Sequence, residues 1–458
     1  MDWAEHARQA DDTSWHQLRD SAEAVILGGG IAGSATAIAL LNAGIRPLLL
    51  VRPNRGIRMT EVIPASTMQL FDALRVSELA CQSAVIGHGL DNRWNPNTPV
   101  FRDEPFLVFD RLVLADSMLR EARRRGANVE KVVGIPSVRN QRDRVIVALA
   151  GKTQKFPVAI DASGRAAAWS RPVSRVRHLA ADVFQAEATN SHITLKLVRS
   201  KDGWAYLVNL RERATVVLLS PPSRPQVILP DELADELHLR KASIQWTGRR
   251  AAYVQAPANV VTGRVLAVGD AAFAHDPVAG QGVRFALASA LAAAAVIATC
   301  RRSENDRELA TVFYEEFVRT ECNRHCSFLH SLYEGRPDFV AVGGQATAAP
   351  PIARAREMNL GRPVCFAGRV EPAPLHIGGY IERGEVLRLS DGGAVRWLGG
   401  FDLLRLRDLA RQPTAIPKLV AMMASDRIHT EQQCLAVIQW CYDRKILAEL
   451  QEIPSCKA

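Results

Sequence analysis

The chain has 458 residues, of which 48% are hydrophobic and 23% are charged, so it is long enough for two or three domains with sizeable cores. This composition excludes a wholly disordered chain. Fifty-seven basic and forty-eight acidic side chains give a formal net charge of +9, and only nine of the basic residues are lysine. The positive charge is too diffuse to indicate nucleic-acid binding.

No signal peptide is visible, because the first residues contain acids and no apolar core. The longest uncharged apolar run, Phe285–Cys300, is shorter than the ~20 residues that span a bilayer. The eight cysteines are scattered, unlike a disulfide framework. Cys322 and Cys326 flank His325, but no second ligand pair follows, which favours ordinary helix thiols over a metal site. We therefore expect a cytoplasmic protein without a membrane or metal partner.

The first predicted elements form a βαβ unit. A short apolar strand, Ala24–Leu27, is followed by a glycine-rich turn and a helix from about Ile31 to Asn42. A turn at residues 43–44 leads to a second strand, Pro47–Val51. Strand, turn, helix and parallel strand in this order are typical of a dinucleotide-binding domain.

Gly28, Gly30 and Gly33 have the GxGxxG spacing in this turn. The first glycine allows the tight turn, the second lets a pyrophosphate approach the backbone, and the third allows helix–strand packing. The N–H groups at the start of the helix, around Ile31 and Ala32, would face the phosphates. The second strand ends at Val51–Arg52 instead of the usual acid, so the ribose contact is predicted to come from Arg52 or from backbone.

Further elements follow in the order expected of an α/β domain with an insertion. A helix is predicted at Asp116–Arg125, and residues 178–253 alternate like an antiparallel sheet. Strands are predicted at Lys131–Val138, Arg144–Ala150, Phe156–Ile160 and Val265–Val268, and later helices at Gln281–Cys300 and Asp306–Leu332. The fold class is therefore α/β: a Rossmann-like domain (residues 1–175 and 262–335) with an inserted antiparallel substrate sheet (176–261).

The C-terminal residues follow a separate pattern. Residues 336–374 are rich in Gly and Pro and are predicted to be an irregular linker. Glu385–Leu389 and Ala394–Leu398 form a predicted hairpin, followed by three short helices at about residues 401–411, 415–424 and 430–442. We interpret residues 375–458 as a small winged-helix-like domain.

Three further motifs, added to the glycine turn, resemble the class A flavoprotein monooxygenases. They are Gly263–Gly282, which contains Gly269–Asp270, then Asp161–Arg165, and Phe109–Arg111. The resemblance implies FAD as the cofactor, with Asp270 accepting hydrogen bonds from ribityl hydroxyls. The remaining implied cofactor contacts are Arg111, Asp161, Gly164, Gly269, Pro277, Gly280, Gln281 and Gly282.

Two shorter segments are similar to the tryptophan-halogenase branch of this family: Thr60–Pro64, which contains Glu61, and Asp202–Tyr206. Those halogenases need a lysine soon after the Glu-containing segment, and here no lysine precedes Lys131. Their Trp-x-Trp-x-Ile-Pro signature is also absent, the nearest string being Arg93–Pro96. The sequence therefore predicts hydroxylation and disfavours halogenation.

Charge disfavours DNA binding by the C-terminal domain. Residues 371–458 contain eleven basic and eleven acidic side chains, and the third predicted helix, Thr430–Tyr442, has no Lys or Arg. A recognition helix normally supplies cations to phosphates and bases. Similar modules recognise leader or precursor peptides, and a packing or dimerisation role is an equal alternative.

The combination of motifs and C-terminal module is similar to the flavoprotein monooxygenases that mature the tryptophylquinone subunit of quinohemoprotein amine dehydrogenases. This resemblance implies hydroxylation of a tryptophan side chain in a small protein partner, with electrons from an external reductant or reductase. Glu61 and His275 are candidate catalytic groups near the flavin, and a structural role is an equal alternative for His275. The alternatives are a small-molecule aromatic hydroxylase of secondary metabolism and, less favoured, a flavin-dependent DNA-binding regulator.

Overall fold

The computed structural model describes residues 22–53, 59–95, 99–149, 151–170, 172–176, 179–187, 192–200, 203–221, 228–333, 358–389, 393–425 and 428–449. These residues form two compact units. The first contains the residues up to Arg307 together with Tyr333, and the second contains Glu308–Leu332 with the residues from 358 onward. The helix α8 (Arg307–Leu332) thus groups with the C-terminal residues, whereas the sequence assigned it to the first domain.

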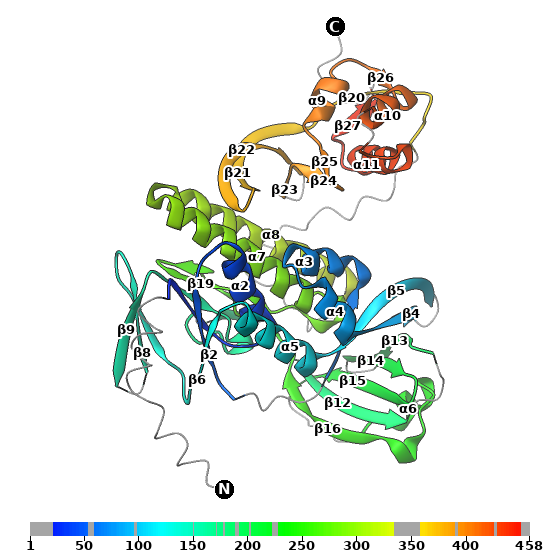
Figure 1. Cartoon of the computed structure of the whole chain (residues 1–458). Coiled ribbons are helices and arrows are strands. Elements are labelled where there is room, and N and C mark those ends of the chain that lie inside the picture. The colour runs from blue at the N-terminus through cyan, green and yellow to red at the C-terminus, as the bar shows by residue number, and fades with distance from the viewer. Residues whose placement is uncertain are drawn as a thin grey trace. The chain divides into compact units, whose positions relative to one another are not determined.

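The first unit is built on a six-stranded sheet with the order β18-β19-β10-β1-β2-β6 (Figure 1). Neighbouring strands are parallel except β18 and β19. The strands are β1 (Ala24–Leu27), β2 (Pro47–Val51), β6 (Asn128–Lys131), β10 (Val158–Asp161), β18 (Val261–Thr262) and β19 (Val265–Ala267). Because parallel strands end at one edge of the sheet, the loops after the adjacent β1, β10 and β19 lie together.

Helix α2 (Ile31–Asn42) packs against α5 (Arg111–Arg124) and α7 (Gly282–Arg302), as Figure 1 shows. Helix α5 begins five residues before its predicted start, because the Asp110 carboxylate caps it by accepting the Leu112 and Val113 N–H groups at 2.9 and 3.2 Å. Among the described residues, one helix, α7, is long enough and apolar enough to cross a membrane. In the structure, 78% of its apolar stretch is buried.

A second sheet of eight strands has the order β16-β12-β15-β14-β13-β4-β5-β3. Five strands come from the predicted insertion: β12 (Ala180–Glu187), β13 (Leu195–Ser200), β14 (Gly203–Leu210), β15 (Arg213–Ser220) and β16 (Gln245–Ala251). The other three, β3 (Thr60–Pro64), β4 (Ala84–Arg93) and β5 (Val100–Asp110), precede the insertion and bring Glu61 and the start of α5 to this sheet. The sheet is therefore larger than the range 176–261 predicted for it.

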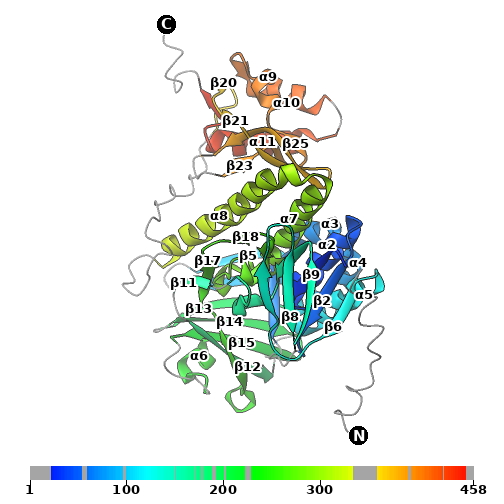
Figure 2. The same cartoon turned by 90° about the vertical axis from the view of Figure 1, so that its left-hand side faces the viewer.

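One face of this sheet is covered by α6 (Asp231–Glu236) (Figure 2). Ala205, Leu207 and Val216 pack there against Leu233 of α6. Tyr206 and Val208 alternate to the opposite face, where they pack against β3 and β5. The first unit also contains α3 (Met68–Ala73), α4 (Ser77–Ser83), and the paired strands β11 (Pro172–Val176) and β17 (Val254–Pro257).

A small antiparallel sheet, β7 (Ser137–Asn140), β8 (Val145–Leu149) and β9 (Lys152–Phe156), precedes β10. The prediction of a single strand at Lys131–Val138 is wrong, because these residues divide between β6 and β7. Gly134 has φ +85° in the turn that separates β6 from β7. The predicted strand Phe156–Ile160 likewise divides between β9 and β10.

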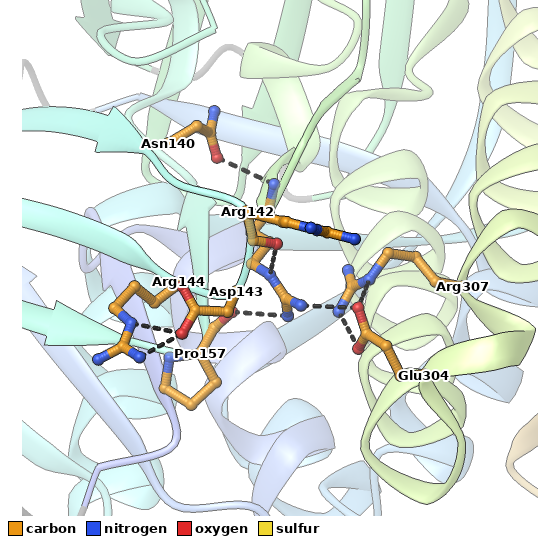
Figure 3. Close-up of polar contacts among 8 residues, drawn as sticks. Asn140, Arg142, Asp143, Arg144, Pro157, Glu304 and Arg307 are labelled. Atoms are coloured by element: carbon orange, nitrogen blue, oxygen red, sulfur yellow. Dashed lines mark hydrogen bonds and ion pairs between the residues drawn. The ribbon is translucent and has the colours of Figure 1, made fainter.

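Arg264, immediately before β19, fixes this small sheet to the main one. Figure 3 shows its partners Asn140, Arg142 and Glu304. Its backbone N–H donates to Asn140 Oδ1 at 2.9 Å, and its guanidinium donates to the Arg142 carbonyl at 3.1 Å and to Glu304 Oε1 at 2.6 Å. Arg307 donates to the same Glu304 oxygen at 2.6 Å. These contacts hold the start of β19, and the far end of β19 leads into Gly269–Asp270.

The second unit has its own core, which includes Leu403, Leu419, Ile438 and Leu447. Its elements are α8, β20 (Pro363–Phe366), β21 (Arg369–Ile377), β22 (Tyr380–Arg388), β23 (Ala394–Val395), β24 (Trp397–Leu398), β25 (Phe401–Asp402), α9 (Arg405–Leu409), β26 (Thr414–Ala415), α10 (Ile416–Ala424), α11 (Glu431–Asp443) and β27 (Leu447–Glu449). The three predicted short helices are present as α9, α10 and α11.

The predicted linker 336–374 is wrong at its C-terminal end. Residues 363–366 form β20, which pairs with β26 and β27, and β21 begins at Arg369. The larger hairpin is therefore β21–β22, and the predicted hairpin is a short extension in which Leu387 and Arg388 pair with β23. Residues 334–357 lie outside the described residues. The winged-helix interpretation stays a prediction.

Candidate active site

The glycine turn after β1 is tightly packed at two of its three motif positions. Gly28 has φ +117°, and a Cβ there would lie 2.3 Å from the Ala162 carbonyl oxygen. A Cβ on Gly33 would lie 1.9 Å from the Gly28 carbonyl oxygen. Apart from Gly30 itself and the residues next to it in the chain, no atom lies within 4 Å of a Cβ built on Gly30. Gly28 and Gly33 are thus required by packing, whereas Gly30 leaves space beside the backbone.

That space adjoins the N-terminus of α2. Gly30 is the N-cap residue, no side chain caps the helix, and its first turn contains no acid. The first N–H groups of a helix have no intrahelical acceptor, and the helix dipole favours an anion there. The open space and the uncapped helix start fit a pyrophosphate. Ile31 is buried and Ala32 is half-buried beneath this end. Arg52 is exposed after β2, and its ribose role stays a prediction.

Asp161 organises the loop after β10. Its carboxylate is fully buried and accepts five hydrogen bonds from its own loop. Oδ1 accepts Ser163 N–H at 3.0 Å and Oγ–H at 2.6 Å, while Oδ2 accepts Trp169 N–H, Ser170 N–H and Ser170 Oγ–H at 2.8–2.9 Å. Both oxygens are therefore occupied, so the structure gives Asp161 a loop-forming role in place of the predicted cofactor contact. Gly164, with φ +67°, turns the same loop.

The loop after β19 carries Gly269 and Asp270. Gly269 has φ +57°, and a Cβ on it would lie 2.6 Å from the Ala32 Cβ, so close packing on α2 requires glycine. Its N–H donates to the buried Ser289 Oγ of α7 at 2.9 Å. The Asp270 side chain is 19% exposed at the same sheet edge as the glycine turn. A carboxylate there can accept hydrogen bonds from ribityl hydroxyls.

Arg165 joins these loops, a role that the sequence analysis did not assign to it. Its Nε lies 3.5 Å from Asp270 Oδ2. Its other nitrogens donate to the carbonyls of Tyr253 and, at 3.1 Å, of His275. Gln255 in turn donates to the Arg165 carbonyl at 3.1 Å. Arg165 is the last residue of the predicted motif Asp161–Arg165, and a cation beside a required carboxylate is a signal that could have marked its role.

Glu61 and Arg111 form an ion pair between β3 and the start of α5. Arg111 Nη1 donates to Glu61 Oε1 at 2.7 Å. The Glu61 carboxylate is the main cause of a raised Arg111 pKa, and Asp270 adds to it. Nearby, burial raises the pKa of the Tyr206 phenol and lowers that of the Arg250 guanidinium. Because Arg111 is influenced by the charges of both Glu61 and Asp270, these three side chains lie in one neighbourhood.

Solved structures match this chain in fold, whereas no protein-family model and no curated protein matches its sequence significantly. Peptidyl tryptophan dihydroxylase QhpG, essential for tryptophylquinone cofactor biogenesis, matches with a TM-score of 0.63 and 21% identity over 93% of this chain and 99% of that chain. The flavin-dependent halogenase CmlS matches with a TM-score of 0.70 and 18% identity over 93% of this chain and 95% of that chain. Aklavinone-11 hydroxylase, in a complex with FAD and aklavinone, matches with a TM-score of 0.57 and 15% identity over 70% of this chain and 72% of that chain.

The fold is that of the class A flavoprotein monooxygenases. Within this flavoprotein monooxygenase fold, the glycine turn, the Asp161 loop and the Asp270 loop meet at one sheet edge, as the order of the motifs predicts. The residues at that edge fit an FAD: a space and an uncapped helix for the pyrophosphate, and the Asp270 carboxylate for the ribityl chain.

His275 lies in an aromatic core. Its ring centroid is 4.5 Å from that of Phe273 and 5.0 Å from that of Phe285, and the residue is 3% exposed. Of the two roles that the sequence left open for His275, this packing favours the structural one, and a catalytic role stays a prediction. Glu61 remains the candidate catalytic group, held by Arg111.

Pro277–Ala279 form a short 3₁₀ turn that ends at Gly280, with φ +59°, before α7 begins at Gly282. Gln281 is the N-cap of α7 and accepts a hydrogen bond from Arg284. Cofactor contacts by Pro277, Gly280, Gln281 and Gly282 stay predictions.

Cys322 Sγ and Cys326 Sγ are 4.0 Å apart on α8. Among the described residues, no group of three or more His, Cys, Asp or Glu side chains could hold a metal ion.

Proposed function

We propose that this protein is an FAD-dependent monooxygenase that hydroxylates a tryptophan side chain of a small protein partner during tryptophylquinone biogenesis. The observation that carries the proposal is the meeting of the Gly30 space, the start of α2 and Asp270 at one sheet edge. The similarity in fold to a peptidyl tryptophan dihydroxylase, which extends over nearly all of both chains, supports the protein substrate.

Each part of this edge has a separate task. The N–H groups at the start of α2 bind the pyrophosphate, and Asp270 accepts hydrogen bonds from the ribityl chain. The backbone from Pro277 to Gly282 offers N–H groups to the flavin ring. A bound FAD, reduced by an external reductant or reductase, would supply the O2-activating redox chemistry that hydroxylation of an aromatic ring needs. Glu61, held by Arg111, is the candidate group for accepting a proton from that ring.

The C-terminal unit is proposed to dock the partner. A tryptophan inside a polypeptide must be presented together with its chain, which needs protein surface beyond a small-molecule pocket. The unit has its own core, and residues 371–458 carry no net charge. Helix α11 contains no Lys or Arg, which disfavours DNA as the ligand.

Halogenation is the second candidate function, because CmlS matches the fold. The position of Lys196 disfavours halogenation, because the halogenases need a lysine near the substrate. Lys196 of β13 donates to the Glu236 carbonyl of α6, and burial lowers its pKa. Its neighbour Leu195 packs on the other face with Tyr206. Since alternate strand residues point to opposite faces, Lys196 lies on the α6 face, away from Tyr206 and Glu61.

The test is intact-mass analysis after aerobic turnover with FAD and a reductant. The substrates are free tryptophan, a short tryptophan peptide, and small tryptophan-containing proteins, each with its Trp→Phe variant as the matched control, and chloride or bromide is present. Mass gains of whole oxygen atoms on a protein, absent from its Trp→Phe variant, are expected. Oxidation of free tryptophan alone would favour the small-molecule hydroxylase, and any enzyme-dependent halogenated product would favour the halogenase.

A further inference from the structure

Asp276 is a buried carboxylate in the loop that leads to α7. It is 0% exposed and lies between His275 and Pro277. Its Oδ1 accepts the Val278 N–H at 3.0 Å, so it caps the turn Pro277–Ala279. A buried carboxylate is costly unless hydrogen bonds compensate for the lost water. Its second oxygen, Oδ2, therefore also needs a hydrogen-bond donor.

That second oxygen accepts a hydrogen bond from a residue 57 positions away. Tyr333 Oη donates to Asp276 Oδ2 at 3.3 Å, and Tyr333 is 5% exposed. Tyr333 is the residue that directly follows α8, and it belongs to the first unit. Its ring packs edge-on against Trp94, with the centroids 5.2 Å apart. The hydroxyl is thus held at Asp276 by a ring that is itself packed.

The turn capped by Asp276 sets the path of the next residues. Gly280 follows it in the left-handed region, and α7 starts at Gly282. The direction of the backbone N–H groups between Pro277 and Gly282 depends on this turn. A carboxylate that caps the turn with one oxygen and is fixed through the other makes the turn rigid before any ligand binds.

We propose that Tyr333 and Asp276 are positioning residues that hold the Pro277–Gly282 backbone in the conformation that binds the flavin. This inference rests on the proposed function, because it concerns the loop that is expected to face FAD. Neither residue touches the cofactor in this proposal. Both act through the backbone of the loop. Tyr333, which fixes Asp276, directly follows the end of α8.

The first variant is Tyr333→Phe, which keeps the ring against Trp94 and removes the hydroxyl. The chain offers a matched control in the second unit, where Tyr442 Oη donates to Glu449 Oε1 at 3.0 Å and Tyr442 is 3% exposed. Tyr442→Phe therefore removes the same kind of hydrogen bond far from the proposed flavin loop along the chain. Both variants are full-length, and each is compared with the unsubstituted protein.

Three quantities are measured: the Tm of the protein without FAD, the Kd for FAD from the quenching of flavin fluorescence, and the midpoint potential of the bound flavin. Tyr333→Phe is expected to raise the Kd by about tenfold, a factor near the lower end of what a hydrogen bond to a charged group contributes. It is also expected to shift the potential, because the N–H groups at the flavin ring move. Tyr442→Phe is expected to change Tm only.

A second variant, Asp276→Asn, keeps the shape of the side chain and removes its charge. If the two residues act as one unit, adding Tyr333→Phe to Asp276→Asn raises the Kd by less than twofold further. A Kd and potential unchanged in Tyr333→Phe would overturn the positioning role, as would fully additive effects in the double variant. An unsubstituted protein that fails to bind FAD would overturn the proposed function as well, so the two failures are distinguishable.

Discussion

Alanine at Gly30 and at Gly33 should separate cofactor binding from folding. A Cβ on Gly30 meets no atom within 4 Å, and its φ of −75° and ψ of −172° are allowed for alanine. Alanine is a poorer N-cap than glycine, but it restricts the unfolded chain, so we expect the free energy of unfolding to change by no more than about 1 kcal/mol. The added methyl group occupies the space that the pyrophosphate needs, so FAD binding should weaken by at least about tenfold.

Gly33→Ala is the contrasting variant. Its Cβ would lie 1.9 Å from the Gly28 carbonyl oxygen, against 3.4 Å for ordinary contact, so the backbone must open by about 1.5 Å (3.4 − 1.9). Overpacking of this kind costs about 1–3 kcal/mol or more. Both the stability of the protein without FAD and its affinity for FAD should therefore fall.

The assays are urea unfolding without FAD and fluorescence titration with FAD. The reasoning requires that Gly30→Ala loses affinity at nearly normal stability, whereas Gly33→Ala loses both. A Gly30→Ala protein that binds FAD as tightly as the unsubstituted protein would refute the assignment of this space to the pyrophosphate.

Three other predictions concern different parts of the molecule. Asp270→Ala should weaken FAD binding by about 1.5–3 kcal/mol, measured by fluorescence titration, because it removes a charge-assisted hydrogen bond; unchanged affinity would place Asp270 outside the site. Removal of the chain after residue 343 should leave the flavin spectrum native and abolish modification of the protein partner in the mass assay; a well-folded truncated protein that still oxidises its partner would exclude docking by this region. The Glu121 pKa is about 2, below its ordinary 4.5, mainly through a hydrogen bond from Arg124 with a further one from Arg125. The stability it contributes is complete above pH 4.5 and is lost as the pH falls from 4.5 to about 2, so acid unfolding of Glu121→Gln should be less steep in that range.

The truncation removes the part of the second unit that begins at Gly344 and keeps α8, and it departs from the boundary that the sequence suggests. A cut at Pro374, where the predicted linker ends, would divide β21, in which Pro374 pairs with Arg383 of β22. The proline-rich composition of this segment misleads because prolines are tolerated in edge strands and at strand positions that donate no ladder hydrogen bond. The boundary depends on strand pairing, which composition does not report.

The sequence alone predicted the βαβ unit and the order of the flavin motifs. Helix α2 has the predicted bounds, Ile31–Asn42, because glycine spacing and apolar runs are local signals. The requirement for glycine at positions 28 and 33 also follows from the local turn, and the structure confirms it through contacts with Ala162 and Gly28. The order of the motifs then predicted the class A fold, and this prediction needs no knowledge of side-chain geometry.

Only the tertiary structure decided what individual side chains do at the site. Asp161 and Asp270 look alike in sequence, but the first is saturated by its own loop and the second faces the sheet edge. Tyr333 reaches Asp276 across 57 residues. Hydrogen bonds between distant residues depend on where the chain folds back, and no local pattern encodes that. The sequence therefore predicted the fold and the class of cofactor, while the folded chain determined which side chains hold the loops of the candidate site in place.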